Sequence, residues 1–201
     1  FSSVQAEMGV NIGITGQMGL FGASATETED SELNKEDDAM LAVGWGSIFL
    51  EKTLGSRIAV GVDYVPSAIQ SETKEKATTD MTTSNSNTAV TQKIAVDFED
   101  LTTLYVALNV TDNLYVKVGA LTMDVTTKET LGTGSTYPNT SLDGTSIGAG
   151  YNLDMDNGMF FRAEALYMDI DGVKLTSSNS HVVEVSGIDG ATGSISFGKS
   201  F

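Results

Sequence analysis

Six charged residues alternate with small or apolar neighbours in a way that would bring them into one confined space. Three are basic and three are acidic: Arg57, Lys117, Arg162, Asp63, Asp97 and Glu164. Charges that leave water pair with opposite charges, because an isolated buried ion carries a large desolvation cost. We therefore predict a mutually paired polar network in the interior of the fold. Two functions are compatible with it: a filled and stiffened interior, or a narrow pore that the ion pairs close at rest.

A second concentration of charge lies between residues 27 and 38, where seven carboxylates accompany the single base Lys35. This composition predicts a solvated loop. A functional alternative is the binding of divalent cations, or bridging to lipid phosphates through them, since hard cations prefer carboxylate oxygens. The spacing of the acids matches no defined metal site, and we expect no metal centre and no cofactor.

His181 is the only histidine, and Ser178, Ser180 and Glu184 lie close to it in the sequence. Serine and histidine can together form an esterase-like site. In an extended segment, however, Ser180 and His181 point to opposite sides. The sequence also contains no phosphate-binding glycine loop in a helical context, no zinc pattern and no cysteine nucleophile. We therefore expect a protein that is not an enzyme.

The overall composition restricts the partners and the fold. The net charge is -16 and only 11 residues are Lys or Arg, so nucleic-acid binding, which depends on basic side chains, is not expected. No run approaches the roughly 18 to 20 consecutive apolar residues of a membrane helix, so the chain can cross a bilayer only as a closed β-barrel. We expect one domain over residues 1–201. The start at Phe1, with no leader, fits a mature exported chain.

Apolar residues alternate with small or polar ones through most of the chain, which predicts antiparallel strands with one face toward lipid and the other toward a narrow interior. About eight segments show this pattern: 8–22, 39–52, 57–65, 92–110, 114–126, 143–153, 159–170 and 183–201. In 39–52 we place Leu41, Val43, Trp45 and Phe49 outward. In 92–110 we expect the even positions to face outward throughout. Aromatic residues near strand ends, Phe21 and Phe49 among them, predict outward girdles at the two membrane interfaces.

The connections between these segments alternate in length. Residues 27–38, 67–91, 127–142 and 171–182 read as long, solvated loops, and 53–56, 111–113 and 154–158 as short turns. This alternation is typical of an outer-membrane up-and-down barrel with long extracellular loops and short periplasmic turns. We therefore predict an all-β transmembrane antiparallel barrel.

The last strand ends in Ile195, Phe197 and Phe201, which alternate on one face. Together with the architecture, this ending resembles the small eight-stranded outer-membrane barrel family of Gram-negative bacteria, which includes the OmpX, OmpW and OmpA-transmembrane types. Lys199 departs from the family pattern, in which an apolar or aromatic residue is usual. The resemblance implies a location in the outer membrane, contact with its lipids, and recognition of the three C-terminal residues by the barrel-insertion machinery.

From these observations we predict a non-enzymatic barrel with an envelope-structural and surface-contact role, carried by long acidic loops. The loops would contact cells, ions or neighbouring barrels. The alternative is a narrow porin-like channel for small solutes or hydrophobic ligands.

Overall fold

The computed structural model describes residues 9–29, 32–67, 69–70, 74–81, 87–130, 136–178 and 182–201. The regular elements in these ranges are strands: β1 (Val10–Glu29), β2 (Glu32–Leu54), β3 (Ile58–Tyr64), β4 (Ile69–Gln70), β5 (Lys74–Met81), β6 (Asn87–Asn109), β7 (Leu114–Thr130), β8 (Thr140–Asp154), β9 (Met159–Ile170), β10 (Val173–Thr176), β11 (Val182–Val185) and β12 (Ile188–Ser200). No helix in the described ranges is long and apolar enough to cross a membrane.

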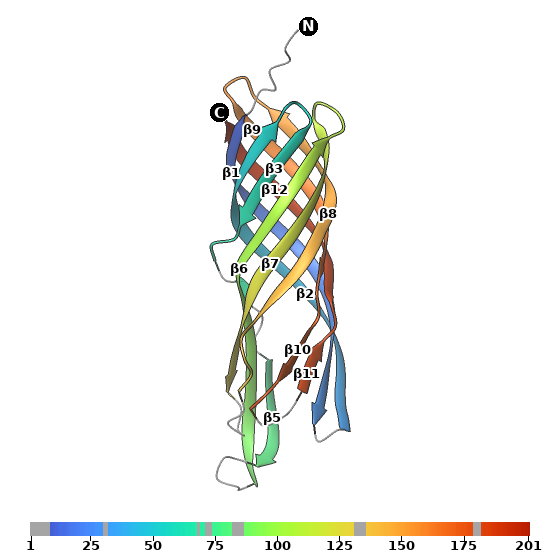
Figure 1. The fold of residues 1–201 in the computed structure, drawn as a ribbon. Coiled ribbons are helices and arrows are strands. Elements are labelled where there is room, and N and C mark those ends of the chain that lie inside the picture. The colour runs from blue at the N-terminus through green and yellow to red at the C-terminus, as the bar shows by residue number, and fades with distance from the viewer. Residues whose placement is uncertain are drawn as a thin grey trace.

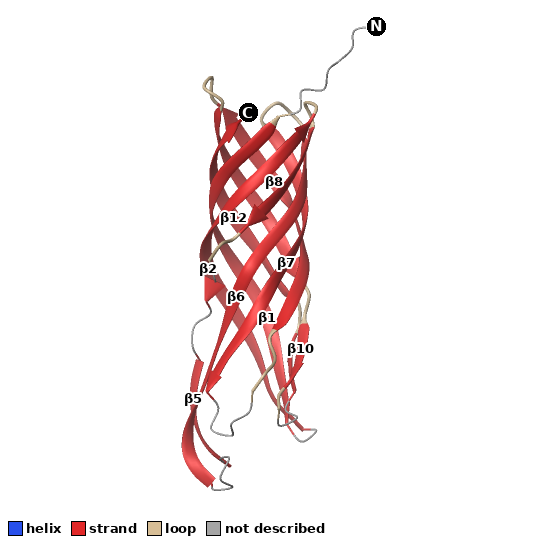
Figure 2. Cartoon of the chain, turned by 60° about the vertical axis from the view of Figure 1, so that its left-hand side comes forward, coloured by secondary structure: helices blue, strands red, loops and turns tan. Residues whose placement is uncertain are grey.

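Eight of these strands close into a barrel. Each pairs antiparallel with its neighbours in the order β1, β12, β9, β8, β7, β6, β3, β2, and β2 pairs again with β1. The strands cross the barrel wall obliquely (Figures 1 and 2). Where neighbouring strands pair, the backbone amides and carbonyls are satisfied, as a structure in lipid requires. The predicted all-β, eight-stranded antiparallel barrel is confirmed.

The two ends of the barrel differ. At the first, called here the short-turn end, the chain reverses at residues 55–57, 110–113 and 155–158. Gly55 and Gly158 have φ values of 72° and 78° in these turns, a conformation that favours glycine. Val10 and Phe201 also meet at this end through two backbone hydrogen bonds of 3.1 and 2.9 Å. At the other, the long-hairpin end, strands continue beyond the barrel (Figure 1).

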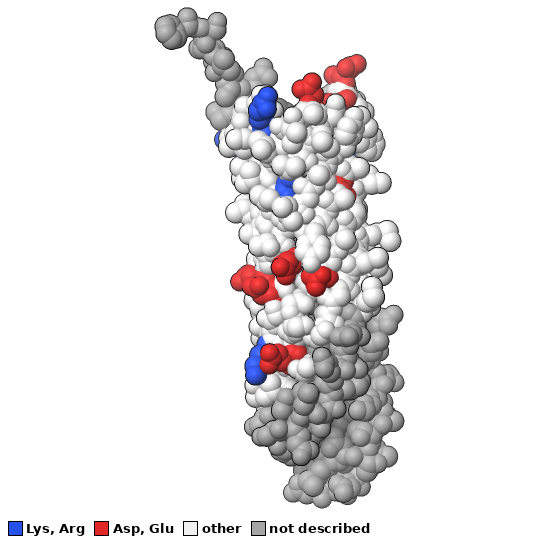
Figure 3. Space-filling model, turned by 90° about the vertical axis from the view of Figure 1, so that its right-hand side faces the viewer, with Lys and Arg blue, Asp and Glu red and all other residues white. Residues whose placement is uncertain are grey.

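The outer surface of the barrel is a belt of exposed apolar side chains. It draws on every strand of the wall, with Ile14, Leu50, Ile58, Leu104, Val118, Ile147, Phe161 and Ile195 as examples. Figure 3 shows one side of the molecule, on which most of the charged residues in view gather near the two ends of a largely uncharged zone. Such a belt is unfavourable in water and favourable in hydrocarbon. It is the part of the barrel that contacts membrane lipid.

The faces of β2 are the reverse of those predicted. Ser47, Phe49 and Glu51 are buried in the interior, while Ile48 and Leu50 are exposed. The predicted outward placement of Leu41, Val43, Trp45 and Phe49 is therefore wrong, and Ala42, Gly44 and Gly46 face outward instead. Residues 41–46 suit lipid on either face, so they do not decide the orientation. Ser47 and Glu51 decide it, because lipid would leave their polar atoms without partners.

One predicted girdle residue of another strand also points inward. Phe21 of β1 is buried in the barrel interior rather than exposed to lipid. Its odd position puts it on the same face as Asn11 and Thr15, which are buried. The girdle prediction is thus wrong for Phe21 as well as for Phe49, since strand phase decides the direction of an aromatic side chain.

The phase of β6 changes at a β-bulge. The register with β7 shifts between Glu99 and Thr102, and Asp100 has a φ of 53°. Beyond the bulge Phe98 pairs with Val125, which is buried in the interior, so Asp97 lies on the outer face. The predicted single phase over 92–110 is therefore wrong, because the extra residue of a bulge exchanges the two faces.

Much of the predicted loop sequence continues the strands past the barrel. β1 and β2 stay paired as far as Glu29 and Glu32, so the described part of 27–38 is a hairpin and not a loop. β4 and β5, which pair with β6, lie within 67–91, and β7 runs to Thr130, within 127–142. β10, which pairs with β11, lies within 171–182. Strands already paired in a barrel can be extended one residue at a time, without the cost of closing a new loop.

The wall is interrupted beside β2. β3 ends at Tyr64, opposite Ile48. From Ser47 toward the long-hairpin end, no described strand pairs with this edge of β2, because β4 and β5 pair with β6. In this stretch β1 is the only described strand that pairs with β2.

Candidate functional site

Arg162 and Glu51 form a buried ion pair across the interior. The Nη1 and Nη2 atoms of Arg162, on β9, lie 2.9 and 2.7 Å from Oε2 and Oε1 of Glu51, on β2. The two side chains are 11% and 1% exposed. Asn11 Nδ2 donates to Glu51 Oε1 at 2.8 Å, and Arg162 Nε donates to Asn152 Oδ1 at 2.9 Å. A planar fork against a carboxylate fixes the position of both groups.

Lys117 and Glu164 form a second buried pair. Lys117 Nζ, on β7, lies 3.1 Å from both carboxylate oxygens of Glu164, on β9, and the side chains are 9% and 6% exposed. The Tyr115 hydroxyl donates a hydrogen bond to Glu164 Oε1, with 2.6 Å between the two oxygens. This pair therefore fills the interior next to the first, since Arg162 and Glu164 are successive inward residues of one strand.

Two tyrosines connect the ion pairs. Tyr105 donates to Glu51 Oε2 at 3.1 Å, and its ring centroid lies 4.0 Å from Lys117 Nζ. Tyr115 donates to Glu164, and its ring centroid lies 5.6 Å from Arg162 Cζ. Each tyrosine thus donates a hydrogen bond to the acid of one ion pair, and its ring lies against the cation of the other. We call these six residues, Glu51, Tyr105, Tyr115, Lys117, Arg162 and Glu164, the polar plug.

Glycines opposite the tyrosines make room for the rings. Gly61 pairs with Tyr105, and Gly150 pairs with Tyr115. A Cβ atom at either glycine would clash with the tyrosine ring opposite it. The inward glycines are therefore part of the plug's packing and do not leave an open lumen at these two positions.

The six predicted network residues divide into three groups. Lys117, Arg162 and Glu164 are in the polar plug. Asp63 lies beside it in the interior, where Ser47 Oγ donates to its Oδ2 at 2.9 Å. Arg57 and Asp97 lie outside the interior.

The structure corrects the placement of Arg57 and Asp97. Arg57 is exposed in the turn at 55–57, where the chain reverses and the strand alternation no longer applies. Asp97 is buried on the outer face beyond the bulge and forms an ion pair with Lys128 of β7. The hydrogen bond to Asp97 raises the pKa of Lys128 above its ordinary value. Lys128, predicted in a loop, is thus part of a paired strand.

Sequence reasoning missed three members of the plug, Glu51, Tyr105 and Tyr115. Glu51 was hidden by the reversed phase assigned to β2. A signal was present, because Glu51 shares its face with Ser47 and Thr53 whereas Ile48, Leu50 and Leu54 share the other. The tyrosines stand at inward positions of β6 and β7, and buried tyrosine hydroxyls need a partner.

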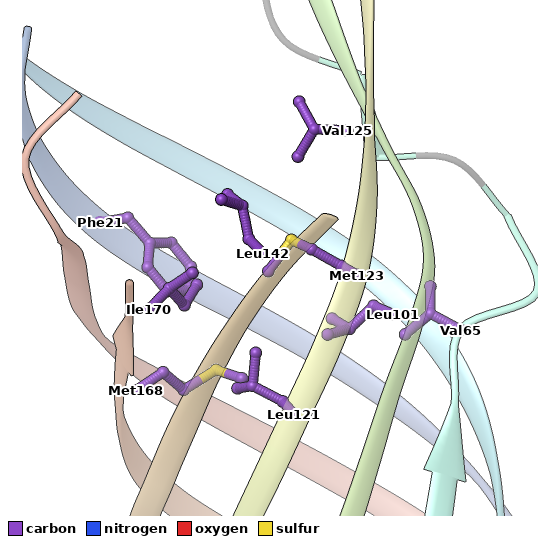
Figure 4. Close-up of a cluster of buried hydrophobic side chains, with 9 residues drawn as sticks. All are labelled: Phe21, Val65, Leu101, Leu121, Met123, Val125, Leu142, Met168 and Ile170. Atoms are coloured by element: carbon purple, nitrogen blue, oxygen red, sulfur yellow. The ribbon is translucent and has the colours of Figure 1, made fainter. Parts of the chain in front are cut away.

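Toward the long-hairpin end the interior becomes apolar. Figure 4 shows a cluster of buried side chains there: Phe21, Val65, Leu101, Leu121, Met123, Val125, Leu142, Met168 and Ile170. Trp45 packs against this apolar cluster, with its ring centroid 6.2 Å from that of Phe21. At the short-turn end Glu51 and Arg162 line an open cavity of about 320 Å³. The described interior therefore contains two successive layers of side chains, one ion-paired and one apolar.

The C-terminal residues face the membrane. Ile195, Phe197 and Phe201 are 68%, 38% and 72% exposed on the outer surface. Lys199 shares this face, and its Nζ lies 5.2 Å from the ring centroid of Phe201. A lysine near the barrel end can extend its ammonium group to the lipid headgroups.

The residues considered for catalysis and metal binding give no described site. Ser180 and His181 lie outside the described residues, and Ser178 is exposed. Where side chains are described, no group of three or more His, Cys, Asp or Glu residues could hold a metal ion.

No protein-family model and no curated protein sequence matches the chain. Several solved structures do. The outer membrane protein OprG of Pseudomonas aeruginosa aligns over 95% of each chain, with 11% identity and a TM-score of 0.57. AlkL, solved in lipid bilayers, aligns over 94% of this chain and 90% of its own, with 15% identity and a TM-score of 0.48. The outer membrane protease OmpT of Escherichia coli aligns over 100% and 99%, with 8% identity and a TM-score of 0.45. At these identities the likeness to OprG establishes the fold and no activity.

Proposed function

We propose that this small outer-membrane β-barrel is a non-enzymatic, non-conducting surface protein, which contributes to envelope structure and presents its long hairpins outside the cell. The main support is the closed interior. A solute entering from the short-turn end would meet the Arg162–Glu51 pair, and one entering from the other end would meet the apolar cluster. Displacing a buried ion pair that is joined by two hydrogen bonds is costly. The barrel therefore does not conduct solutes and acts as a membrane anchor for the hairpins.

The hairpins supply the surface for contact. β1 with β2, and β5 with β6 and β7, extend beyond the apolar belt as paired strands (Figure 2). Paired strands lose less conformational entropy than a flexible loop when a partner binds, which favours contact with large surfaces. The acidic composition of 27–38 favours cationic or cation-bridged partners, and the outward belt favours neighbouring barrels. Before the barrel is in the membrane, the insertion machinery would recognise Ile195, Phe197 and Phe201.

A conductance measurement tests the closed interior. The protein refolded in detergent and added to a planar bilayer should show no stable current steps. A double variant, Glu51→Ala with Arg162→Ala, should also stay silent, because it leaves the apolar cluster in place. Reproducible steps from the unmodified protein would favour the alternative, a narrow channel for small solutes, and would overturn the anchor role.

A second candidate function is the uptake of hydrophobic ligands. It is favoured by one observation, the interrupted wall beside β2. There the edge at 41–47, with which no described strand pairs, adjoins the apolar cluster through Val43 and Trp45. An apolar molecule entering from the long-hairpin end could leave sideways into lipid without passing the polar plug.

Trp45 provides a direct readout of such binding, because it is the only tryptophan in the chain. If apolar ligands enter the cluster, a brominated alkane should quench Trp45 fluorescence with saturation. The matched control is Trp45→Phe with Leu104→Trp, which moves the probe to an outward position that is 62% exposed. Quenching that is linear and equal in both proteins would reflect detergent partitioning only and would eliminate this candidate.

A further inference from the structure

A small cavity with a mixed polar and apolar lining lies between the polar plug and the apolar cluster. Its volume is about 20 Å³. The polar groups on its wall include those of Asp63, Lys117, Ser146 and Glu164, and the apolar side chains are Trp45, Leu101, Leu166 and Met168. A single water molecule needs roughly 10 to 15 Å³ of such space. The cavity is therefore large enough for one water-sized occupant and too small for an organic molecule.

One hydroxyl group on the cavity wall has no partner. Ser146 is 5% exposed, and its Oγ atom forms no hydrogen bond to any described residue. Gly119 pairs directly with Ser146, and a Cβ there would come within 2.8 Å of both Ser146 Oγ and Thr103 Cγ2. Glycine thus preserves space in front of an oxygen atom that is free to act as a ligand.

The charges around the cavity do not cancel. Among the described residues of the polar plug and the cavity wall, the acids are Glu51, Asp63 and Glu164, and the bases are Lys117 and Arg162. Three acids against two bases leave one negative charge. Glu51 and Glu164 are each paired with a base, whereas Asp63 accepts a hydrogen bond from the neutral Ser47 hydroxyl. The excess therefore belongs to Asp63, beside the cavity.

We propose that this cavity binds one small monovalent cation, such as Na⁺, between Asp63 and Ser146. Hard cations prefer oxygen ligands, and the carboxylate and hydroxyl groups of the wall supply them. One positive charge balances the polar plug and the cavity wall, whereas a divalent ion would reverse their net charge. The small volume excludes organic cations. The site lies between the two layers that close the barrel, so its occupant stabilises the closed interior.

The unfolding equilibrium of the full-length protein in detergent micelles tests this proposal. Urea unfolding is followed by Trp45 fluorescence in NaCl and in N-methyl-D-glucamine chloride at equal ionic strength, which keeps general screening constant. A ligand that binds only the folded state raises the free energy of unfolding. Once its concentration exceeds the dissociation constant, this increase is proportional to the logarithm of the concentration. The urea midpoint should therefore be higher in NaCl than in N-methyl-D-glucamine chloride. The free energy of unfolding should rise with the logarithm of the Na⁺ concentration, with the slope expected for one bound ion.

Two variants locate the effect. Asp63→Asn removes the uncompensated charge and should abolish the difference between the two salts. Asp169→Asn, an exposed acid on the outer face of β9, should retain it. Should Asp63→Asn fail to fold, Ser146→Ala keeps the charge and should shift the Na⁺ dependence to higher concentrations. Equal midpoints in the two salts for the unmodified protein, or an undiminished Na⁺ effect in Asp63→Asn or in Ser146→Ala, would overturn the proposal in favour of a water molecule beside a protonated Asp63.

Discussion

Arg162→Ala is expected to lower the free energy of unfolding by about 3 to 5 kcal/mol, whereas Lys174→Ala should lower it by about 0 to 1 kcal/mol. Both changes remove the base of an ion pair. Arg162 belongs to a pair that is almost wholly buried, and its loss leaves the Glu51 carboxylate uncompensated. Lys174 lies 3.2 Å from Glu184, with side chains that are 63% and 57% exposed, so water replaces it. Urea unfolding in micelles, followed by Trp45 fluorescence, measures both.

A double-mutant cycle separates the charge effect from simple loss of volume. Glu51→Gln combined with Arg162→Met removes both charges and keeps most of the packing. Residues in one network are not additive, so the double variant should lose less stability than the sum of the two single variants. Additive losses, or equal losses in Arg162→Ala and Lys174→Ala, would show that Arg162 does not stabilise the interior as an ion-pair partner.

Alternation alone was sufficient to predict most of the barrel, because a strand between lipid and a narrow interior must separate its two kinds of side chain. β7 and β9 illustrate this. Val116 and Val118 face outward while Lys117 faces inward, as expected, and Phe161 and Arg162 divide in the same way. The inward position of Lys117, Arg162 and Glu164 could therefore be predicted from sequence.

The errors arose where alternation was ambiguous or interrupted. Over 41–46 of β2 both faces are compatible with lipid, and only Ser47 and Glu51 reveal which one is inside. The bulge at Asp100 could not be predicted, because it places a residue other than glycine at positive φ and no turn signal marks it. Asp97 was misplaced for this reason. The pairing partners across the interior depend on the register of strands that are distant in sequence, such as β2 and β9, and a single sequence does not contain that register.

The acidic segment 27–38 shows a different limit of prediction from sequence. Charge and polarity predict a segment outside the lipid, but they do not distinguish a loop from an extended hairpin. The pairing of Thr26 with Glu36 and of Glu27 with Lys35 continues the barrel register of β1 and β2. Threonine is favourable in strands, and charged residues on exposed edges oppose aggregation. Composition predicts solvation, and the preceding strands determine the geometry.

The function proposed for the hairpins depends on which end of the barrel faces out, and the expected result is all-or-none. The chain contains no cysteine, so a single introduced thiol reports one position. Ser178→Cys, near the long-hairpin end, should react with a bulky PEG-maleimide on intact cells. Asp156→Cys, in the exposed turn between β8 and β9, should react only after the outer membrane is permeabilised. Short turns stay on the periplasmic side because barrel strands insert from there as hairpins.

The cysteine-free parent protein gives the background of this labelling experiment. Both variants carry the new thiol at an exposed position, so a difference in labelling reports the side of the membrane and not burial. If Asp156→Cys were labelled on intact cells and Ser178→Cys were protected, the topology would be the inverse of the one predicted. The acidic hairpins would then face the periplasm, and a surface-contact role would be impossible. The proposal of a closed interior does not depend on that result, because the polar plug and the apolar cluster both lie inside the barrel whichever end faces out.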